Sequence, residues 1–264
     1  MIARLHIQTA LRGQSTYLKS AFCTPPFKVA DITENKKEAT LQLMLMSSSP
    51  GILDEDAYQM QIDLAEKTCL HLHTQSYQRI FNMKQGATQT MDVHLQSGAS
   101  FCFLPHPSVP HENASFTAKN NIYLSGGCRL LWGEVITCGR KLNGEVFRFS
   151  RYHSITNIFI DHKPVVRENM LITPSSVDIT AMGMWEGFTH QASLIYLDET
   201  PVADETMVAI NEYLSGQAEM EYGITAAPVK GWIIRLLGYK AEQLFDCLKK
   251  ITALLSDKTH VYAQ

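Results

Sequence analysis

Apolar and polar residues alternate along much of the chain between Leu41 and about Leu171. A period of two is typical of strands that bury one face against a core. The clearest runs are Met60, Ile62 and Leu64; Leu70 and Leu72; Met91, Val93 and Leu95; Phe101 and Phe103; Ile122 and Leu124; and Leu130 and Trp132. The pattern therefore predicts a body built mainly of β-strands.

These predicted strands come in pairs that repeat along the sequence. Polar or glycine-containing breaks at Lys67, Gly98 and Gly127 separate the two runs of each pair. A spacing of about thirty residues indicates a weak internal repeat, in which one layer of strands stacks on the next. We therefore expect a body of stacked strands similar to a β-helix, with a β-sandwich as the alternative.

Two short segments carry strong turn or loop signals. Asn143-Gly144 lies between two apolar runs and favours a tight hairpin turn with a strand on either side. Pro105, Pro107 and Pro110 each lack a backbone donor. We therefore predict that the proline segment is a loop or an edge strand at the surface.

The sequence changes from strand to helix spacing beyond about residue 200. A first helix, which Gly216 ends, is predicted from an apolar face of Met207, Val208, Ile210 and Leu214. A second helix is predicted over about 241–255 from an apolar stripe of Leu244, Phe245, Leu248, Ile251, Leu254 and Leu255. Burying six such side chains is worth about 9–18 kcal/mol, so the stripe must dock on the β body or on a partner, and we favour the body.

A short apolar run at residues 231–238 separates the two predicted helices and is expected to be a returning strand. We therefore expect one domain over residues 1–264. Its β body spans about 1–200, and a helix–strand–helix addition spans about 201–264.

Composition excludes several classes of protein. The 264 residues include 23 Lys and Arg against 26 Asp and Glu, a net charge of −3 that argues against a nucleic-acid partner. No apolar run has the length of a membrane span, and no signal-peptide core is recognisable, so no membrane association and a cytoplasmic location are expected. The six cysteines are far apart without a CxxC pair, which favours reduced thiols that are mostly buried.

Common catalytic motifs are missing from the sequence. No Gly-Lys pair of a P-loop occurs, and GxGxxG, GxSxG and HExxH are absent too. These absences favour a binding or scaffold protein, although an enzyme stays possible.

Histidines are the weak candidates for metal ligands. His71 and His73 lie two residues apart on a predicted strand and therefore point to the same face. A cupin places a glutamate ligand four or five residues after such a pair, but here those positions hold Tyr77 and Gln78. The cupin interpretation thus lacks a third ligand, and a pair of polar residues on a solvated strand face is the favoured alternative.

The proline segment offers a second weak metal candidate. His106 and His111 flank it, and Glu112 lies beside them, so these residues offer a mobile surface site for a soft divalent ion. An ordinary edge loop is the favoured alternative.

An ion pair is predicted near the Asn-Gly turn. Arg140 and Glu145 stand on either side of it, close enough to pair across a hairpin. A structural clip is the favoured interpretation, and a contact for a partner protein is the alternative. No nucleophile with an orienting base lies nearby, so a catalytic dyad is not indicated.

Five segments of the chain, taken together, carry a family resemblance. They are Thr24–Phe27 (TPPF), Ser49–Asp56 (SPGILDED), His73–Phe81 (HTQSYQRIF), Gly98–Pro107 (GASFCFLPHP), and Glu134 followed by Gly139-Arg140 and Gly144-Glu145. In their order and spacing they resemble the UreD family of urease accessory proteins, called UreH in some bacteria, over nearly the whole length. Glu55 departs from the family's usual glycine, and His73 stands where the family often has threonine.

The resemblance assigns a set of residues to a partner-binding or structural motif. They are Asp56, Gln75, Pro105, Pro107, Glu134, Gly139, Arg140, Gly144 and Glu145. It also implies a mostly β, helix-like coil with a few α-helices.

The function implied by the resemblance is that of a non-catalytic scaffold. Such a protein links a UreF-like helical accessory protein and a UreG-like nickel GTPase to the urease apoprotein for nickel insertion. No cofactor would be bound stably, nickel would be present only in transit, and the assembly would be heteromeric and doubled through the partner. A metal-dependent β-fold enzyme and a generic β-rich interaction module are the alternatives.

Overall fold

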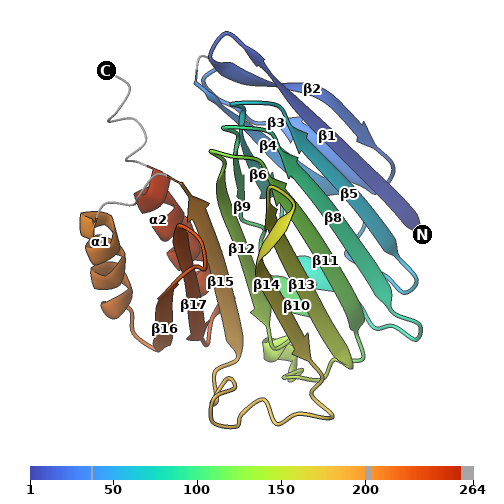
Figure 1. Ribbon diagram of the computed structural model, residues 1–264. Helices are drawn as coiled ribbons and strands as arrows, with labels where there is room; N and C mark the ends of the chain where they lie inside the picture. Colours follow the sequence, from blue (N-terminus) through green and yellow to red (C-terminus); the bar gives the residue numbers. More distant parts are fainter. Residues whose placement is uncertain (37, 200–203, 257–264) are drawn as a thin grey trace.

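Two β-sheets face each other, and two α-helices lie at the C-terminal end of the chain (Figure 1). The structure is a computed structural model that describes residues 1–36, 38–199 and 204–256. The predicted class, mainly β with two α-helices towards the C-terminus, is confirmed. No helix within the described ranges is long and apolar enough to cross a membrane.

The first sheet, sheet A, has seven strands in the order β14-β13-β11-β8-β5-β1-β2. Its strands are β1 (Ile2–Arg12), β2 (Ser15–Cys23), β5 (Ala57–Leu64), β8 (Ala87–Leu95), β11 (Ser115–Leu124), β13 (Arg151–Ile160) and β14 (Lys163–Ile172).

The second sheet, sheet B, has its main strands in the order β16-β17-β15-β12-β9-β6-β4-β3. These strands are β3 (Phe27–Asp31), β4 (Thr40–Ser47), β6 (Cys69–Thr74), β9 (Ser100–Phe103), β12 (Arg129–Thr137), β15 (His190–Asp198), β16 (Met220–Ala226) and β17 (Gly231–Gly238). Two short strands, β7 (Gln78–Ile80) and β10 (Ser108–Pro110), pair with each other, and β10 also pairs with β12.

The predicted breaks are the turns that carry the chain from one sheet to the other. Strands β5, β8 and β11 are parallel neighbours in sheet A, and β6, β9 and β12 are parallel neighbours in sheet B. Lys67, Gly98 and Gly127 lie in the turns that join each strand of sheet A to the next strand of sheet B. All three have a positive φ, of 57°, 69° and 73° respectively. The turns also stack on one another, because Lys67 N donates to Ser97 O and Gly98 N donates to Gly126 O.

The main core fills the space between the two sheets. Its buried members include Met60, Ile62, Leu64, Leu70, Leu72, Met91, Val93, Leu95, Phe101, Phe103, Ile122, Leu124, Leu130 and Trp132, which are the residues of the predicted alternating runs. The alternation of the sequence therefore identified the inner faces of the strands correctly.

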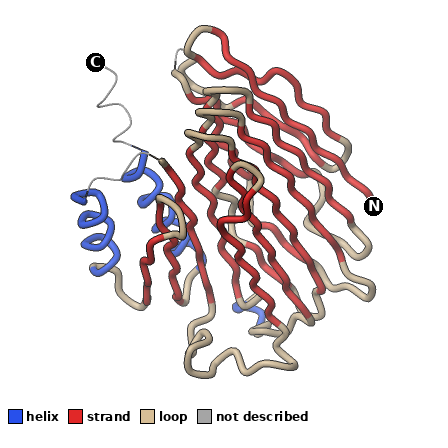
Figure 2. The backbone as a smooth tube through the Cα atoms, viewed as in Figure 1, coloured by secondary structure: helices blue, strands red, loops and turns tan. Residues whose placement is uncertain are grey.

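The helices lie together on one side of the molecule (Figure 2). They are α1 (Asp204–Ser215) and α2 (Ala241–Ser256), close to the predicted ranges. The stripe of α2 is buried against the outer face of sheet B at Leu244, Phe245, Leu248, Ile251 and Leu255. The expectation that this stripe belongs to the core is thus confirmed.

Two details of the predicted C-terminal addition are wrong. Val208, placed on the apolar face of the first helix, is 55% exposed, because α1 buries only a narrow edge that includes Ile210 and Leu214. The segment between the helices contains two strands, since β16 precedes the predicted β17. Strand β16 lies at the edge of sheet B with its side chains exposed or half-buried, so its apolar pattern is weak.

The predicted hairpin at Asn143-Gly144 is also wrong. Strand β12 ends at Thr137, and the next strand, β13, lies in the opposite sheet. Between them is a single 3₁₀ turn, η1 (Lys141–Asn143), which Gly144 closes with a φ of 80°. Asn-Gly favours positive φ, and this suits the end of a helical turn as well as a hairpin.

The proline segment is not a surface loop. Pro107, Ser108, Pro110 and His111 are buried, and the segment contributes the short strand β10. A strand of three residues tolerates proline because it needs few backbone donors. The backbone around it is paired instead by Gln78 N donating to Pro107 O and by His111 N donating to Ile80 O.

Candidate functional site

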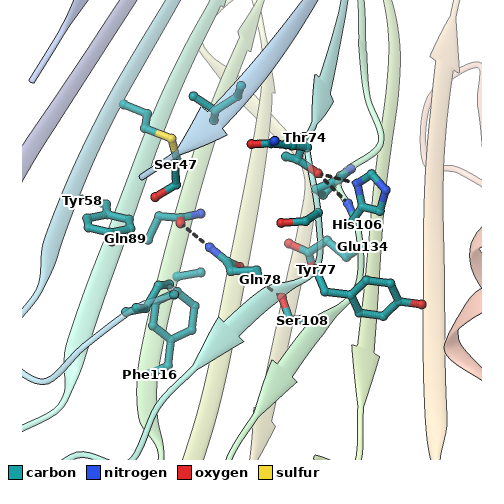
Figure 3. Close-up of a pocket in the computed structure, with 18 of the residues that line it drawn as sticks. Ser47, Tyr58, Thr74, Tyr77, Gln78, Gln89, His106, Ser108, Phe116 and Glu134 are labelled. Carbon is teal, nitrogen blue, oxygen red and sulfur yellow. Dashed lines mark hydrogen bonds between the residues drawn. The ribbon is translucent and has the colours of Figure 1, made fainter. Parts of the chain in front are cut away.

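A cavity of about 150 Å³ lies between the two sheets, beside the short strands β7 and β10 (Figure 3). Its polar wall residues include Ser47, Thr74, Gln75, Gln78, Gln89, His106, Ser108, Asn120 and Glu134. Aromatic side chains complete the wall, among them Tyr58, Phe103, Phe116, Trp132 and Tyr152. A space of this size and polarity has room for several waters.

Glu134 places a carboxyl group at an inward position of sheet B. It lies on β12 between Trp132 and Ile136, both buried in the core, and alternation directs it to the same side. Ser154 Oγ donates to both of its oxygens at 3.0 and 3.1 Å, and Asn120 Nδ2 donates at 3.3 Å. Burial raises the pKa of Glu134 to about 7 despite these donors.

The polar groups around Glu134 form a connected set. Asn120 Nδ2 also donates to Thr156 Oγ1 at 3.0 Å, so it ties the strands β11 and β13 to the carboxyl group. Both Asn120 and Ser154 are 2% exposed. Such buried and satisfied donors hold fixed positions, which makes the environment of Glu134 well defined.

A second group of polar side chains crosses the cavity between β8, β7 and β10. Gln78 Nε2 donates to Gln89 Oε1 at 2.9 Å, and Ser108 Oγ donates to Gln78 Oε1 at 3.1 Å (Figure 3). At another part of the wall, the Thr74 hydroxyl and His106 Nδ1 are 2.9 Å apart. Burial is the main cause that lowers the pKa of His106. Its ring is therefore neutral at pH 7.

A second carboxylate lies towards the edge of the interior. The charge of Glu168 on β14 contributes to the raised pKa of Glu134. Glu168 Oε1 accepts a hydrogen bond from Arg235 Nη2 of β17 at 2.6 Å. This ion pair spans the two sheets, because β14 belongs to sheet A and β17 to sheet B.

Strand register gathers these polar residues into two facing rows. Across sheet A, Asn120 is in register with Thr156, and Thr156 with Glu168. Across sheet B, Glu134 is in register with Ser193, and Ser193 with Arg235. At this level of the interior, the row is thus polar on the side of β13, β14, β15 and β17. On the other side the same row continues from Asn120 to Met91, Met60 and Leu5 and is apolar.

The chemistry available in the cavity is limited. Burial raises the pKa of Tyr58 to about 12 and also raises that of Tyr152, so both phenols stay protonated at neutral pH. Within the described ranges, no three or more His, Cys, Asp or Glu side chains are arranged to hold a metal ion. Glu134 can therefore exchange a proton near pH 7 or offer its oxygens to a passing cation.

Gly139 is fixed by its surroundings. Its φ is 116°, and a Cβ atom there would lie 2.7 Å from Glu145 O and 2.9 Å from Pro110 O. Only glycine accepts both the conformation and the close approach.

Arg140 and Glu145 form the predicted ion pair, although no hairpin is present. Arg140 Nε donates to Glu145 Oε2 at 2.9 Å, and Arg140 Nη2 donates to Glu145 Oε1. Glu145 Oε2 also accepts from Glu112 N at 3.1 Å. The hydrogen bonds with Arg140 are the largest cause of the lowered pKa of Glu145. Through these hydrogen bonds, Glu145 holds the loop after β12 against the end of the proline segment.

The remaining motif residues lie near the cavity or in turns. Asp56 is buried, and its Oδ2 atom accepts a hydrogen bond from Leu53 N at 2.9 Å, which fixes the turn before β5. Gln75 and Pro105 line the cavity. Glu55, in place of the family glycine, has a φ of 64°, so the backbone keeps a conformation that favours glycine. A role of these residues in partner binding stays a prediction.

The four candidate histidines do not form one site. His106 contacts the ring of Phe245 at 4.8 Å, and His111 is buried against Phe81 at 4.7 Å. Each imidazole thus packs against an aromatic ring, and within the described ranges neither belongs to a group of three or more possible metal ligands, so a metal site at these histidines stays a prediction. His71 is not on a solvated strand face, since burial lowers its pKa to about 4.

Two of the residues that hydrogen-bond to Glu134 were not predicted from the sequence. Asn120 and Ser154 stand at inward positions of strands β11 and β13, where alternation predicts apolar residues. Asn120 lies two residues from Ala118 and from Ile122, both buried. A polar residue at an inward position was therefore the signal that could have found them.

Comparisons with known proteins match nearly the whole chain to one family. The sequence profile described as UreD urease accessory protein matches residues 1–263. A urease accessory protein UreD of Flavobacterium johnsoniae is 44% identical over 95% of this chain and 91% of its own length. Proteins of the same name from Acetivibrio thermocellus and Actinobacillus pleuropneumoniae serotype 3 are 30% and 31% identical, over 96% and 99% of this chain and 97% and 100% of their own lengths. The chain belongs to the UreD family of urease accessory proteins.

Proposed function

We propose that this chain is a non-catalytic scaffold in urease maturation. It links a helical accessory protein of the UreF type and a nickel GTPase of the UreG type to the urease apoprotein, so that nickel enters the urease active site. The observation that carries the proposal is the UreD family match over residues 1–263, with relatives named as urease accessory proteins. The chain itself has no Gly-Lys phosphate-binding motif, and a scaffold that acts with a separate GTPase needs none.

The cavity supports a role for the interior in guiding nickel. Nickel is the cargo in this scheme and is not a resident cofactor. The Glu134 carboxyl group, held by Ser154 and Asn120, offers a pair of oxygens inside the protein that carries a charge when the group is ionised. A single carboxylate among neutral amides and hydroxyls is a weak ligand set, which suits an ion that must be passed on.

The pKa of Glu134 couples the binding of a cation to the release of a proton. Near pH 7 the group is close to half-ionised, because its pKa is about 7. A divalent cation stabilises the ionised form and so displaces the proton. Passage of nickel past Glu134 would therefore release a proton, and departure of the ion would restore it.

The scaffold role is tested by co-expression with the helical accessory protein of the same organism. Affinity purification followed by light scattering is expected to give a stoichiometric complex with two copies of each chain. A monodisperse free chain that does not bind the helical protein would overturn the proposal. Metal analysis and turnover assays on that free chain would then decide between a metal-dependent enzyme and an unrelated interaction module.

The role of the cavity is tested separately within the assembled complex. The variant Glu134→Gln keeps the size of the side chain but removes its charge. It is expected to assemble normally and to lower nickel incorporation into urease, measured as nickel per urease active site. Glu221→Gln, at an exposed position on the edge strand β16, is the matched control. Equal nickel incorporation in both variants would exclude Glu134 from the route while leaving the scaffold role intact.

A further inference from the structure

Metal-ligating side chains form a row on the outer face of sheet B. On β6, Leu70 and Leu72 are buried in the core between the sheets. Since side chains alternate across a strand, Cys69, His71 and His73 point to the opposite face. Three potential ligands therefore follow one another on a single face.

A second thiol joins the row from the neighbouring strand β9. Phe101 and Phe103 belong to the core between the sheets, so Cys102 lies on the outer face, in the cluster that α2 covers. Cys102 is in parallel register with His71. Neighbouring strands are about 4.8 Å apart, and the thiol and the imidazole thus start from adjacent positions.

The two imidazoles are close together, and one has an unsatisfied nitrogen. The ring centroids of His71 and His73 are 6.4 Å apart, with an angle of 75° between the planes. Among the described residues, His73 Nε2 is buried and has no hydrogen-bond partner, although buried polar atoms are normally paired. Burial lowers the pKa of both groups, so both rings are neutral at pH 7, the state in which imidazole binds a metal.

We propose that His71, His73 and Cys102 bind a borderline divalent transition-metal ion of the Zn²⁺ and Ni²⁺ class, with Cys69 as a neighbouring thiol. Imidazole and thiolate are the ligands that such ions favour. Burial raises the pKa of the Cys102 thiol to about 12, so the thiol is protonated in the metal-free chain. The metal ion therefore has to displace this proton, which passes to water as the thiolate becomes the ligand. The site belongs to this chain alone and does not depend on the proposed role in urease maturation.

The site forms by rotation of side chains on an existing backbone. In the described part of the chain, no three such side chains already converge on a common point. Two imidazoles about 2.1 Å from a tetrahedral ion have ring centroids about 5 Å apart. The observed separation of 6.4 Å therefore has to close by about 1 Å. Rotation of the two rings about their side-chain bonds supplies such a change without moving the strand.

Metal titration of the untagged full chain, freed of metal with a chelator, tests the proposal. Zn²⁺ and Ni²⁺ are titrated in separate arms by calorimetry and by equilibrium dialysis, and one equivalent is expected to bind in at least one arm. The double variant His71→Gln/His73→Gln is expected to weaken that binding by about 100-fold or more. The matched control is His6→Gln/His94→Gln on sheet A, whose two imidazoles contact Asp63 at 2.6 and 3.0 Å.

Three results would overturn the proposal. They are no binding of either ion, wild-type affinity in the His71/His73 variant, and loss of binding in the His6/His94 control alone. Circular dichroism establishes that the variants are folded. If the His71/His73 variant does not fold, X-ray absorption of the metal-loaded wild-type chain decides. Nitrogen ligands with one sulfur at about 2.3 Å support the site, and a shell of oxygen atoms alone contradicts it.

Discussion

The buried carboxyl group of Glu134 predicts a specific pH dependence of stability. Burial raises its pKa in the folded chain from 4.5 to about 7. The folded state therefore holds a proton that the unfolded state has already lost at intermediate pH. A contribution of this sign is fully present below about pH 4.5 and is lost as the pH rises through about 7.

The size of the effect follows from the shift. Each pKa unit corresponds to about 1.4 kcal/mol, so full ionisation of Glu134 costs about 3 kcal/mol of folding free energy. Glu134→Gln cannot ionise and escapes this cost. Between pH 5 and pH 8 the variant is therefore expected to gain about 2–3 kcal/mol relative to the wild-type chain.

The assay is urea denaturation of both chains at pH 5 and at pH 8. The glutamine amide changes the hydrogen bonding with Ser154, but this offset is the same at both pH values and cancels in the comparison. Other groups with shifted pKa values, such as His71 and His190, are present in both chains and cancel too. Glu221→Gln at an exposed position should show no such gain. A pH-independent difference between wild type and Glu134→Gln would refute the reasoning.

Two further predictions concern packing. Gly139→Ala places a Cβ atom within 2.7 and 2.9 Å of two carbonyl oxygens and should lower the free energy of unfolding by about 2 kcal/mol or more, whereas Gly144→Ala, with no atom near its Cβ, should cost about 1 kcal/mol. Equal losses for the two in urea denaturation would contradict the close approach. Leu248→Ala on the buried side of α2 should cost about 2–5 kcal/mol, and Val208→Ala on the exposed side of α1 should change stability by less than about 0.5 kcal/mol. A small loss for Leu248→Ala would mean that α2 does not pack as described.

The sequence predicted the inner faces of the strands because burial there follows a simple rule. Residues such as Met60, Phe101 and Leu130 alternate with polar neighbours, and each is buried between the sheets. The turns at Gly98 and Gly127 were recognisable for a similar reason, since both need positive φ. Local chemistry and strand periodicity are properties of a few neighbouring residues, so a single sequence reveals them.

Features that depend on distant partners could not be predicted in this way. The Asn143-Gly144 turn has the same local chemistry in a hairpin and at the end of a 3₁₀ turn, and only the different sheets of the flanking strands decide between them. His71 was expected to be solvated because its neighbours in sequence are uninformative about what covers the outer face. Cys102 of the adjacent strand lies beside His71 on that face, and strand register alone brings the two together.

The candidate site shows how a polar interior arises within a regular stack of strands. Parallel register repeats the same inward position from strand to strand, so that Met60, Met91 and Asn120 lie in one row. Replacing methionine by asparagine in a single layer turns the row from apolar to polar. The change would be costly alone, because a buried amide needs partners. Glu134 and Thr156 supply those partners.

Ionisation of Glu134 costs the folded chain about 3 kcal/mol of folding free energy, so this carboxyl group is poorly suited to a purely structural task. Glutamine would keep the hydrogen bond with Asn120 and avoid the charge, and an apolar residue would extend the core that Trp132 and Ile136 already form. The loss of folding free energy sets in near pH 7, the range in which Glu134 gains and releases its proton. An ionisable group at this inward position therefore agrees with the proposed use of its charge in the passage of a divalent cation, for which a neutral glutamine would not serve.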